Sequence, residues 1–233
     1  MCGRYALING KMIFQLFGKN HLGNRQDALD DLPRYNAAPM QRMPAIAIRD
    51  GELVLLKMQW WLIPHWSKDG KIKATTFNAK AETLDQSKLF APYFKSSRCL
   101  VPADAFYEWK RITAKEKQPM CIRMKDQKPF MFAGLFSVWK NEKGDEFPSF
   151  TIITTEPNKL MADIHTRMPA ILPRKHFDQW LDKEYKDTDK LKRLLKSYPE
   201  SKMSAYPVSS YVSNSRNEGP ECMKELAFPI SFL

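Results

Sequence analysis

Cys2 combines an unusual position with unusual chemistry, because it follows the initiator Met1 directly. Once Met1 is removed, the α-amine and thiol of Cys2 form a 1,2-aminothiol. The amine can condense with an aldehyde, and the adjacent thiol can then close a thiazolidine ring. An α-amine titrates near ~7.7–8, so part of it is uncharged at neutral pH. Any protein whose second residue is Cys has the same terminus after Met1 is removed. The Met1-Cys2 dipeptide alone therefore does not decide whether this aminothiol is functional or coincidental.

Glu108 lies within the aromatic stretch AFYEW at 105–109. In a strand of this kind a carboxylate is partly desolvated, and its pKa rises toward the range of a general acid. The alternative is a strand whose alternation turns Glu108 toward water.

Two further polar residues are candidates. Of the four histidines, His165 is the best placed, since Arg167 follows it by two positions and can hold a phosphate oxygen in a bidentate fork. A structural or surface histidine is the alternative. Asn78 is either a catalytic amide or an ordinary helix N-cap with Glu82 near the first turn.

Common catalytic motifs are absent from the sequence: Gly-x-Gly-x-x-Gly, the phosphate loop, His-Glu-x-x-His and Gly-x-Ser-x-Gly. The four cysteines, at positions 2, 99, 121 and 222, form no Cys-x-x-Cys pair, which disfavours a zinc knuckle and a disulfide framework. We therefore predict no cofactor and no metal.

The location is expected to be cytoplasmic, or nucleoid-associated in a bacterium. Free thiols suit a reducing compartment. No apolar run is long enough to span a bilayer, because the best candidate, 53–63, is interrupted by Lys57 and Gln59.

Lys and Arg together number 37 against 26 acidic residues, giving a net charge of +11. This excess indicates a polyanionic partner, with nucleic acid as the leading candidate. Part of the excess falls in 183–196, where leucines at helical spacing indicate a helix with a solvated lysine face.

The pattern of elements predicts one α+β domain over 1–233, built on antiparallel strands. Strands are expected at 2–8, 45–49, 53–60, 99–109, 120–124, 130–138 and 150–154. Turns are expected at Asp50-Gly51 and at 126–128. Helices are expected at 11–17, ended by Gly18, and at 157–164 and 173–181. Residues 18–43 and 64–76 are expected to be long surface connections.

Six segments occur in the order typical of one family: MCGRYAL, RYNAAPMQ, WxLIPxW at 60–66, NAKAET, CLVPADAFYEWK and HTRMP. The chain resembles the SRAP (SOS-response-associated peptidase) family, whose eukaryotic members include the 5-hydroxymethylcytosine-binding, embryonic-stem-cell-specific protein. The resemblance runs from Cys2 to about Pro173, with a weaker tail at 208–225. It implies a barrel-like antiparallel core with short flanking helices.

The resemblance also implies a function in the DNA damage response. The chain is expected to bind single-stranded DNA in a shallow basic cleft and to link Cys2, freed of Met1, to abasic sites as a thiazolidine. Asn78 would orient the Cys2 amine, Glu108 would assist opening of the sugar ring, and His165 would shuttle protons. A monomer is expected, with no membrane partner.

Contacts to DNA are implied for five more residues. Arg4, Lys80 and Arg167 would hold phosphates, while Pro39 and Trp66 would pack against bases or sugars. Such contacts tolerate any sequence.

Three positions depart from the family pattern: Trp61 replaces a usual Gly, Lys80 a common Arg, and Met40 a common Thr. Lys80 keeps the charge but loses the bidentate fork, so weaker positioning of phosphate is expected.

Two other functions stay open. The first is a cysteine peptidase with Cys2 as nucleophile and His165 as base, acting at least on its own Met1–Cys2 bond, with lyase activity also implied by the family. The second is a non-covalent single-strand-binding module.

Overall fold

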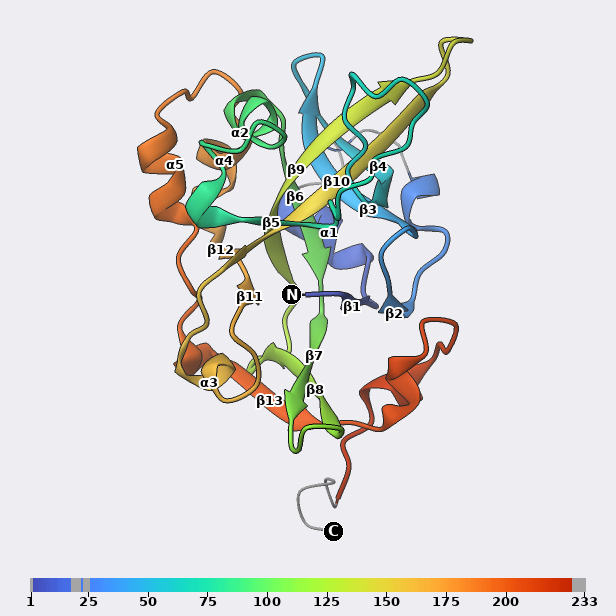
Figure 1. Cartoon of the computed structure of the whole chain (residues 1–233), viewed down its shortest axis with the longest axis vertical. Coiled ribbons are helices and arrows are strands. Elements are labelled where there is room, and N and C mark those ends of the chain that lie inside the picture. Colours follow the sequence, from blue (N-terminus) through green and yellow to red (C-terminus); the bar gives the residue numbers. More distant parts are fainter. Residues whose placement is uncertain (1, 18–21, 23–25, 228–233) are drawn as a thin grey trace.

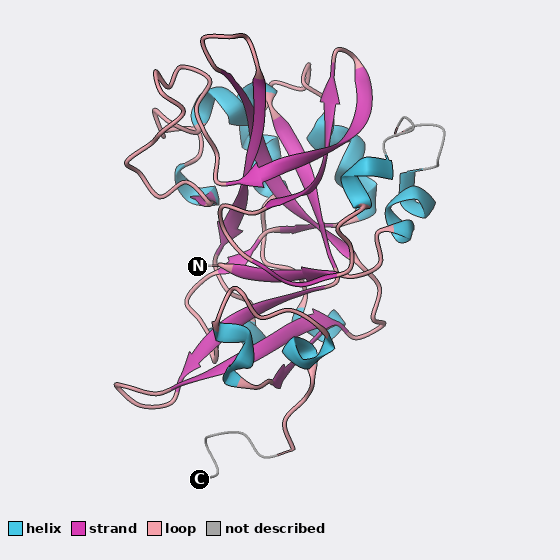
Figure 2. Ribbon diagram, turned by 90° about the vertical axis from the view of Figure 1, so that its right-hand side faces the viewer, coloured by secondary structure: helices cyan, strands magenta, loops and turns pink. Residues whose placement is uncertain are grey.

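The computed structural model describes residues 2–17, 22 and 26–227. It shows an α+β architecture in which two sheets meet and short helices lie around them (Figures 1 and 2). The sequence predicts that Met1 is removed and that Gly18 ends the helix at 11–17. Both residues lie outside the described residues.

The strands of the described residues are β1 (Arg4–Leu7), β2 (Arg34–Ala37), β3 (Arg42–Arg49), β4 (Glu52–Trp60), β5 (Asn78–Lys80), β6 (Arg98–Ala103), β7 (Ala105–Arg111), β8 (Lys117–Met124), β9 (Phe130–Lys140), β10 (Glu146–Thr155), β11 (Met168–Pro169), β12 (Ile171–Leu172) and β13 (Met203–Pro207). The α-helices are α1 (Lys11–Phe17), α2 (Ala91–Ser96), α3 (Lys159–Ala162), α4 (Phe177–Leu181) and α5 (Thr188–Leu194). Short 3₁₀ helices occupy Gln26–Leu29, Ala81–Thr83, Arg174–His176, Glu200–Lys202, Ser210–Ser213 and Pro220–Met223.

Five strands close into a barrel in the order β10-β4-β3-β6-β9, with β9 pairing back to β10. Strand directions cannot alternate all the way around an odd ring, so one neighbouring pair must be parallel. That pair is β4 and β10. β5 also pairs with β10 in parallel, so the predicted antiparallel architecture holds with these two exceptions.

Gly134 in β9 shows how closely the barrel strands approach each other. A Cβ at this position would lie 2.8 Å from Cys99 Sγ and 2.9 Å from the Thr151 carbonyl oxygen, so only glycine fits.

The second sheet, in the order β13-β8-β7-β1-β2, is antiparallel throughout. β6 in the barrel and β7 in this sheet are consecutive and separated only by Asp104. The Asp104 carboxylate accepts the N–H groups of Ile8 (2.5 Å) and Asn9 (3.1 Å), which anchors the crossover. The single strand predicted at 99–109 is therefore wrong, because the chain changes sheet at Asp104.

β1 lies midway along the long axis, between the barrel above and the β7-β8-β13 region below (Figure 1). Its Tyr5 packs into the common core, where the ring lies 5.1 Å from Trp60 and 5.8 Å from Phe132. Packing at the junction of the two sheets therefore holds β1 in place, and Cys2 lies two residues before its first residue, Arg4.

The local turn predictions are confirmed. Asp50 (φ 53°) and Gly51 (φ 84°) join β3 and β4 with the backbone of a type I′ hairpin. A turn also occurs at Gln127 (φ 57°), although the strands that flank it, β8 and β9, belong to different sheets.

Several predicted boundaries need correction. Residues 18–43 are not one connection, since β2 and the start of β3 fall within them and pair with neighbouring strands. The helix predicted at 157–164 shortens to α3, because Asn158 rather than Pro157 provides the N-cap. The helix at 173–181 begins with a 3₁₀ turn before α4. No helix of the described residues is long and apolar enough to cross a membrane.

Candidate functional site

Cys2 is fully buried at the junction of the sheets. Its Sγ lies 3.8 Å from the carbonyl oxygen of Arg4. Burial, and next the charge of Glu108, raise the pKa of the thiol far above its usual value. The thiol of Cys2 is therefore neutral at physiological pH, and it lies close enough to Glu108 to sense its charge.

Glu108, in β7, is only 3% exposed, so the alternative in which it faces water is wrong. Burial raises the pKa of Glu108 to about 7. The carboxyl is thus divided between its protonated and ionised forms near neutral pH, which is the condition for donating and accepting protons in one reaction cycle.

His165 lies between α3 and β11, and its Nε2 is 3.9 Å from Oε2 of Glu108. Its Nδ1 accepts the backbone N–H of Arg167 at 3.0 Å. That hydrogen bond assigns the proton of the neutral ring to Nε2, which faces the Glu108 carboxyl. Burial is the main cause that lowers the pKa of His165, and the charges of Lys117 and Arg167 add to the effect, so the ring is neutral at physiological pH.

Asn78 begins β5 and is 8% exposed, so its prediction as a helix N-cap is wrong. Its Nδ2 donates to the carbonyl oxygens of Phe77 (2.9 Å) and Ile152 (3.3 Å). Its buried Oδ1 has no hydrogen-bond partner among the described residues. A buried amide oxygen without a donor is costly, and it suits a site that receives an N–H from a reacting group.

Arg4 is half-buried at the edge of the same region. Its guanidinium donates to the carbonyl oxygens of Gly3 (2.9 Å) and Ser213 (3.3 Å). Burial lowers the pKa of Arg4, although the group stays charged. No acidic side chain of the described residues forms an ion pair with Arg4, so its positive charge is available to an anion.

Lys80 ends β5 and Arg167 directly precedes β11, and both of these strands pair with β10. Lys80 pairs in register with Thr154, whose carbonyl oxygen accepts a 2.6 Å hydrogen bond from Arg167. Arg167 also forms a bidentate pair with Glu82, at 2.9 and 2.8 Å. Sequence reasoning missed this partner, because Glu82 and Arg167 are 85 positions apart in the sequence. Lys80 is exposed, while Arg167 is held by Glu82 in this structure.

The predicted packing residues lie on exposed turns. Pro39 is half-buried, and Met40, which follows it with φ 75°, is 59% exposed. Trp66 is also 59% exposed, so a free aromatic face is present. Trp61 instead tilts against Phe77 at 5.4 Å, so this departure from the family pattern is partly absorbed into packing.

The structure thus brings Glu108 and His165 within 3.9 Å of each other, and Cys2 is near enough for the charge of Glu108 to raise the pKa of its thiol. Asn78 and Lys80 share β5, and Arg167 reaches the same stretch of β10. No hydrogen bond within the described residues joins Asn78 to Cys2.

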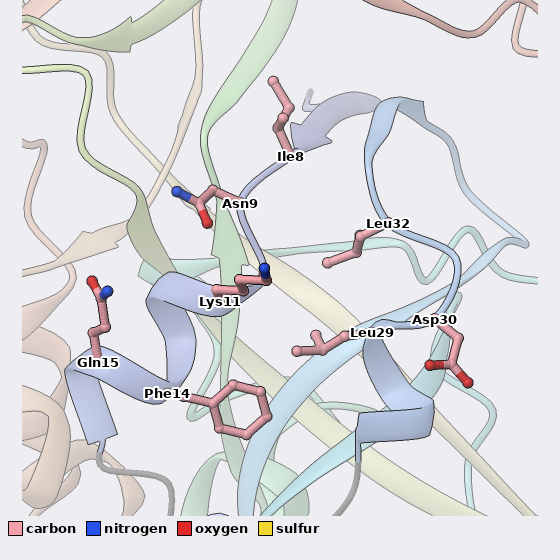
Figure 3. Close-up of a pocket in the computed structure, with 9 residues that line it drawn as sticks. Ile8, Asn9, Lys11, Phe14, Gln15, Leu29, Asp30 and Leu32 are labelled. Carbon is pink, nitrogen blue, oxygen red and sulfur yellow. The ribbon is translucent and has the colours of Figure 1, made fainter.

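A separate pocket of about 690 Å³ lies between α1 and the 3₁₀ helix Gln26–Leu29 (Figure 3). Phe14, Leu29 and Leu32 line its apolar side. None of the predicted site residues borders it. The described residues hold no group of three or more His, Cys, Asp or Glu side chains that could bind a metal ion.

Comparisons with known proteins agree on one family. The family model described as SOS response associated peptidase (SRAP) matches residues 1–215. The chain is 46% identical over 225 residues to the abasic site processing protein YoqW of Bacillus subtilis (strain 168), covering 96% of this chain and 99% of that relative. It is 30% identical over 268 residues to the abasic site processing protein HMCES of Rattus norvegicus, covering 96% of this chain and 75% of that relative. A crystal structure of a Bacteroides thetaiotaomicron protein has a TM-score of 0.83 at 26% identity, covering 97% of this chain and 100% of that chain.

Proposed function

The chain belongs to the SRAP family, and from this membership and the geometry of the site we propose that it processes abasic sites in DNA by forming a covalent adduct through Cys2. The observation that carries the proposal is the grouping of Cys2, Glu108 and His165 at the start of β1. The names of the relatives, which describe abasic site processing, support the same substrate.

The reaction needs the amine of Cys2, so Met1 must first be removed. The amine adds to the aldehyde carbon of the ring-opened abasic sugar, and loss of one water gives an imine. The sulfur then adds to the imine carbon while the thiol proton passes to nitrogen. A thiazolidine results with no oxidant or reductant, and the sulfur is held beside a strongly electrophilic imine carbon, so ring closure does not depend on a resting thiolate.

Glu108 carries the proton transfers, and His165 supports its ionised form. With its pKa raised to about 7, Glu108 can protonate the ring oxygen of the sugar as the ring opens, and its carboxylate can then accept a proton. The Nε2–H of His165 faces that carboxyl and can donate a hydrogen bond to the carboxylate. The free Oδ1 of Asn78 is suited to accept an N–H of the Cys2 amine and so orient the lone pair.

Binding of the strand rests on charge and stacking. Arg4 and Lys80 offer cationic groups to phosphates. Arg167 can also bind a phosphate if it releases one or both of its hydrogen bonds to the Glu82 carboxylate. Trp66 offers an exposed ring for packing, and Pro39 offers a half-exposed one. These contacts read no base, which suits a lesion that has lost its base.

A cysteine peptidase fits the site less well. A nucleophilic cysteine needs a depressed pKa or a base that removes its proton, whereas burial raises the pKa of Cys2. Self-cleavage of the Met1–Cys2 bond assisted by Glu108 stays within the proposal as one route to the free amine, and a lyase step is a further route for the imine.

The test uses an abasic single-stranded oligonucleotide and denaturing gels. Wild type is expected to give a heat-stable adduct and Cys2→Ala none, while both bind an undamaged strand with similar affinity. Cys2→Ser keeps the amine but lacks the thiol, so only an imine that borohydride traps is expected. A heat-stable adduct of Cys2→Ser would sink the thiazolidine mechanism.

A further inference from the structure

The turn that joins β7 and β8 carries a concentration of positive charge that the proposed site does not use. Its cations are Lys110, Arg111, Lys115 and Lys117, against the single acid Glu116. Within the described part of the chain, none of the four forms an ion pair with an acidic side chain. The strands run from the level of β1 toward the lower end of the molecule (Figure 1).

Arg111 and Lys117 are direct cross-strand partners. Like charges placed opposite each other in an antiparallel pair repel and destabilise it. Both side chains are exposed, and an anion between them would convert this repulsion into attraction. The arrangement therefore favours a partner that carries closely spaced negative charges.

The turn itself is well ordered by hydrogen bonds. Thr113 Oγ1 accepts the N–H groups of Lys115 (3.3 Å) and Glu116 (3.0 Å), and the N–H of Ile112 donates to the Glu116 carbonyl oxygen at 3.0 Å. Because this backbone is fixed, the cations are presented in a defined direction.

This charge is continuous with the proposed site. Arg4 pairs in register with Tyr107, so alternation puts Arg4, Trp109, Arg111 and Lys117 on one face of the sheet. Ser213 confirms the shared face, because its carbonyl oxygen accepts from Arg4 and its hydroxyl accepts from Trp109 (3.0 Å). Arg111 lies four residues along β7 from Tyr107, the partner of Arg4, which corresponds to about 13 Å.

Lys117 also senses the reaction centre, since its charge adds to the burial that lowers the pKa of His165. This influence acts at long range, because the alternation that groups Lys117 with Arg4 turns Glu108 to the opposite face of β7.

We propose that Arg111 and Lys117, with Lys115 in the turn between them, bind the phosphates of the abasic strand on one side of the lesion. This extends the contact beyond Arg4 and rests on the proposed function. The occupant is the strand that enters the site, because one face joins the turn to Arg4 and a polyanion satisfies the opposed cations.

The test measures affinity for an undamaged single strand as a function of salt. Arg111→Gln/Lys117→Gln is expected to lower the slope of log affinity against log salt by about 1.4, because each phosphate contact on a single strand contributes about 0.7. Arg111→Lys/Lys117→Arg keeps both charges and should keep the slope. Lys125→Gln/Lys128→Gln removes equal charge at the other end of β8 and serves as the control. An unchanged slope in the first variant, or an equal loss in the control, would overturn the proposal.

Strand position gives a second readout. With a lesion near one end of the oligonucleotide, the difference between wild type and Arg111→Gln/Lys117→Gln should disappear for one polarity and persist for the other. A difference independent of polarity would refute a one-sided contact. Adduct formation by wild type tests the proposed function separately. If wild type forms the adduct but Arg111→Gln/Lys117→Gln has the same salt slope as wild type, only the phosphate contact at the β7–β8 turn is refuted. If wild type binds no single strand, both the contact and the proposed function are refuted.

Discussion

Nε2 of His165 lies 3.9 Å from Oε2 of Glu108, and the backbone N–H of Arg167 occupies the other ring nitrogen of His165. The hydrogen bond fixes the tautomer, and the separation leaves the two groups near each other without a tight ion pair. A small shift is enough for Nε2–H to donate a hydrogen bond to the Glu108 carboxylate, directly or through one intervening water, once Glu108 has given up its proton.

Glu108→Gln should change how stability depends on pH. The folded-state pKa of Glu108, about 7, exceeds its unfolded value, so the protonated carboxyl favours folding. This contribution is fully present below about pH 4.3 and is lost as pH rises through about 7, amounting to about 4 kcal/mol in total. Urea unfolding of both proteins at several pH values should show wild type losing stability relative to the variant over this window. Parallel profiles would contradict a buried carboxyl with a raised pKa.

Asn78→Ala should slow adduct formation by roughly tenfold, which corresponds to about 1.4 kcal/mol of transition-state stabilisation. The reason is that the Oδ1 acceptor for the Cys2 amine is removed. Single-turnover rates at saturating protein measure the effect, and affinity for an undamaged strand should change little. A rate equal to that of wild type would remove Asn78 from the mechanism.

Glu82→Gln should strengthen binding of single-stranded DNA by releasing Arg167, its bidentate partner. Arg167→Gln should weaken binding and lower the salt slope by about 0.7. In the double variant the gain from Glu82→Gln should be much smaller, because the released group is missing. If Glu82→Gln strengthens binding equally with and without Arg167, the effect is general charge and not a phosphate contact by Arg167.

Trp66→Ala should weaken binding by about 1–3 kcal/mol if a base stacks on its exposed ring, while leaving the salt slope unchanged. Phe147→Ala removes another exposed aromatic side chain and is the matched control. Equal losses in the two variants would argue against a specific stacking position at Trp66.

Local sequence signals predicted the parts of the fold that depend on neighbouring residues. The Asp50-Gly51 turn and helix 11–17 were predictable because their backbone chemistry is written in a few adjacent positions. The change of sheet at Asp104 was not, because it depends on backbone N–H groups of Ile8 and Asn9, almost a hundred positions away.

In the candidate site, too, local features were predictable from the sequence and contacts between distant residues were not. Aromatic neighbours indicated the burial of Glu108, whereas its contact with His165 depends on how the two sheets meet. Arg167 is predictable as a cation, but its pairing with Glu82 arises because β5 and β11 both lie against β10. Motif order in the family resemblance supplied the grouping that local reasoning could not.

The central claim is that the Cys2 amine is the nucleophile, and Met1 gives its most direct test. While Met1 remains, the Cys2 nitrogen is an amide with no usable lone pair. Samples with Met1 retained and removed, each verified by intact mass, would be incubated with the same abasic strand, and the products would be measured by intact mass. The processed protein should gain the mass of the strand less one water, and the retained form should bind the strand without an adduct. Equal adduct yields from a stably retained Met1 would contradict the claim and would point to another nucleophile, such as a lysine.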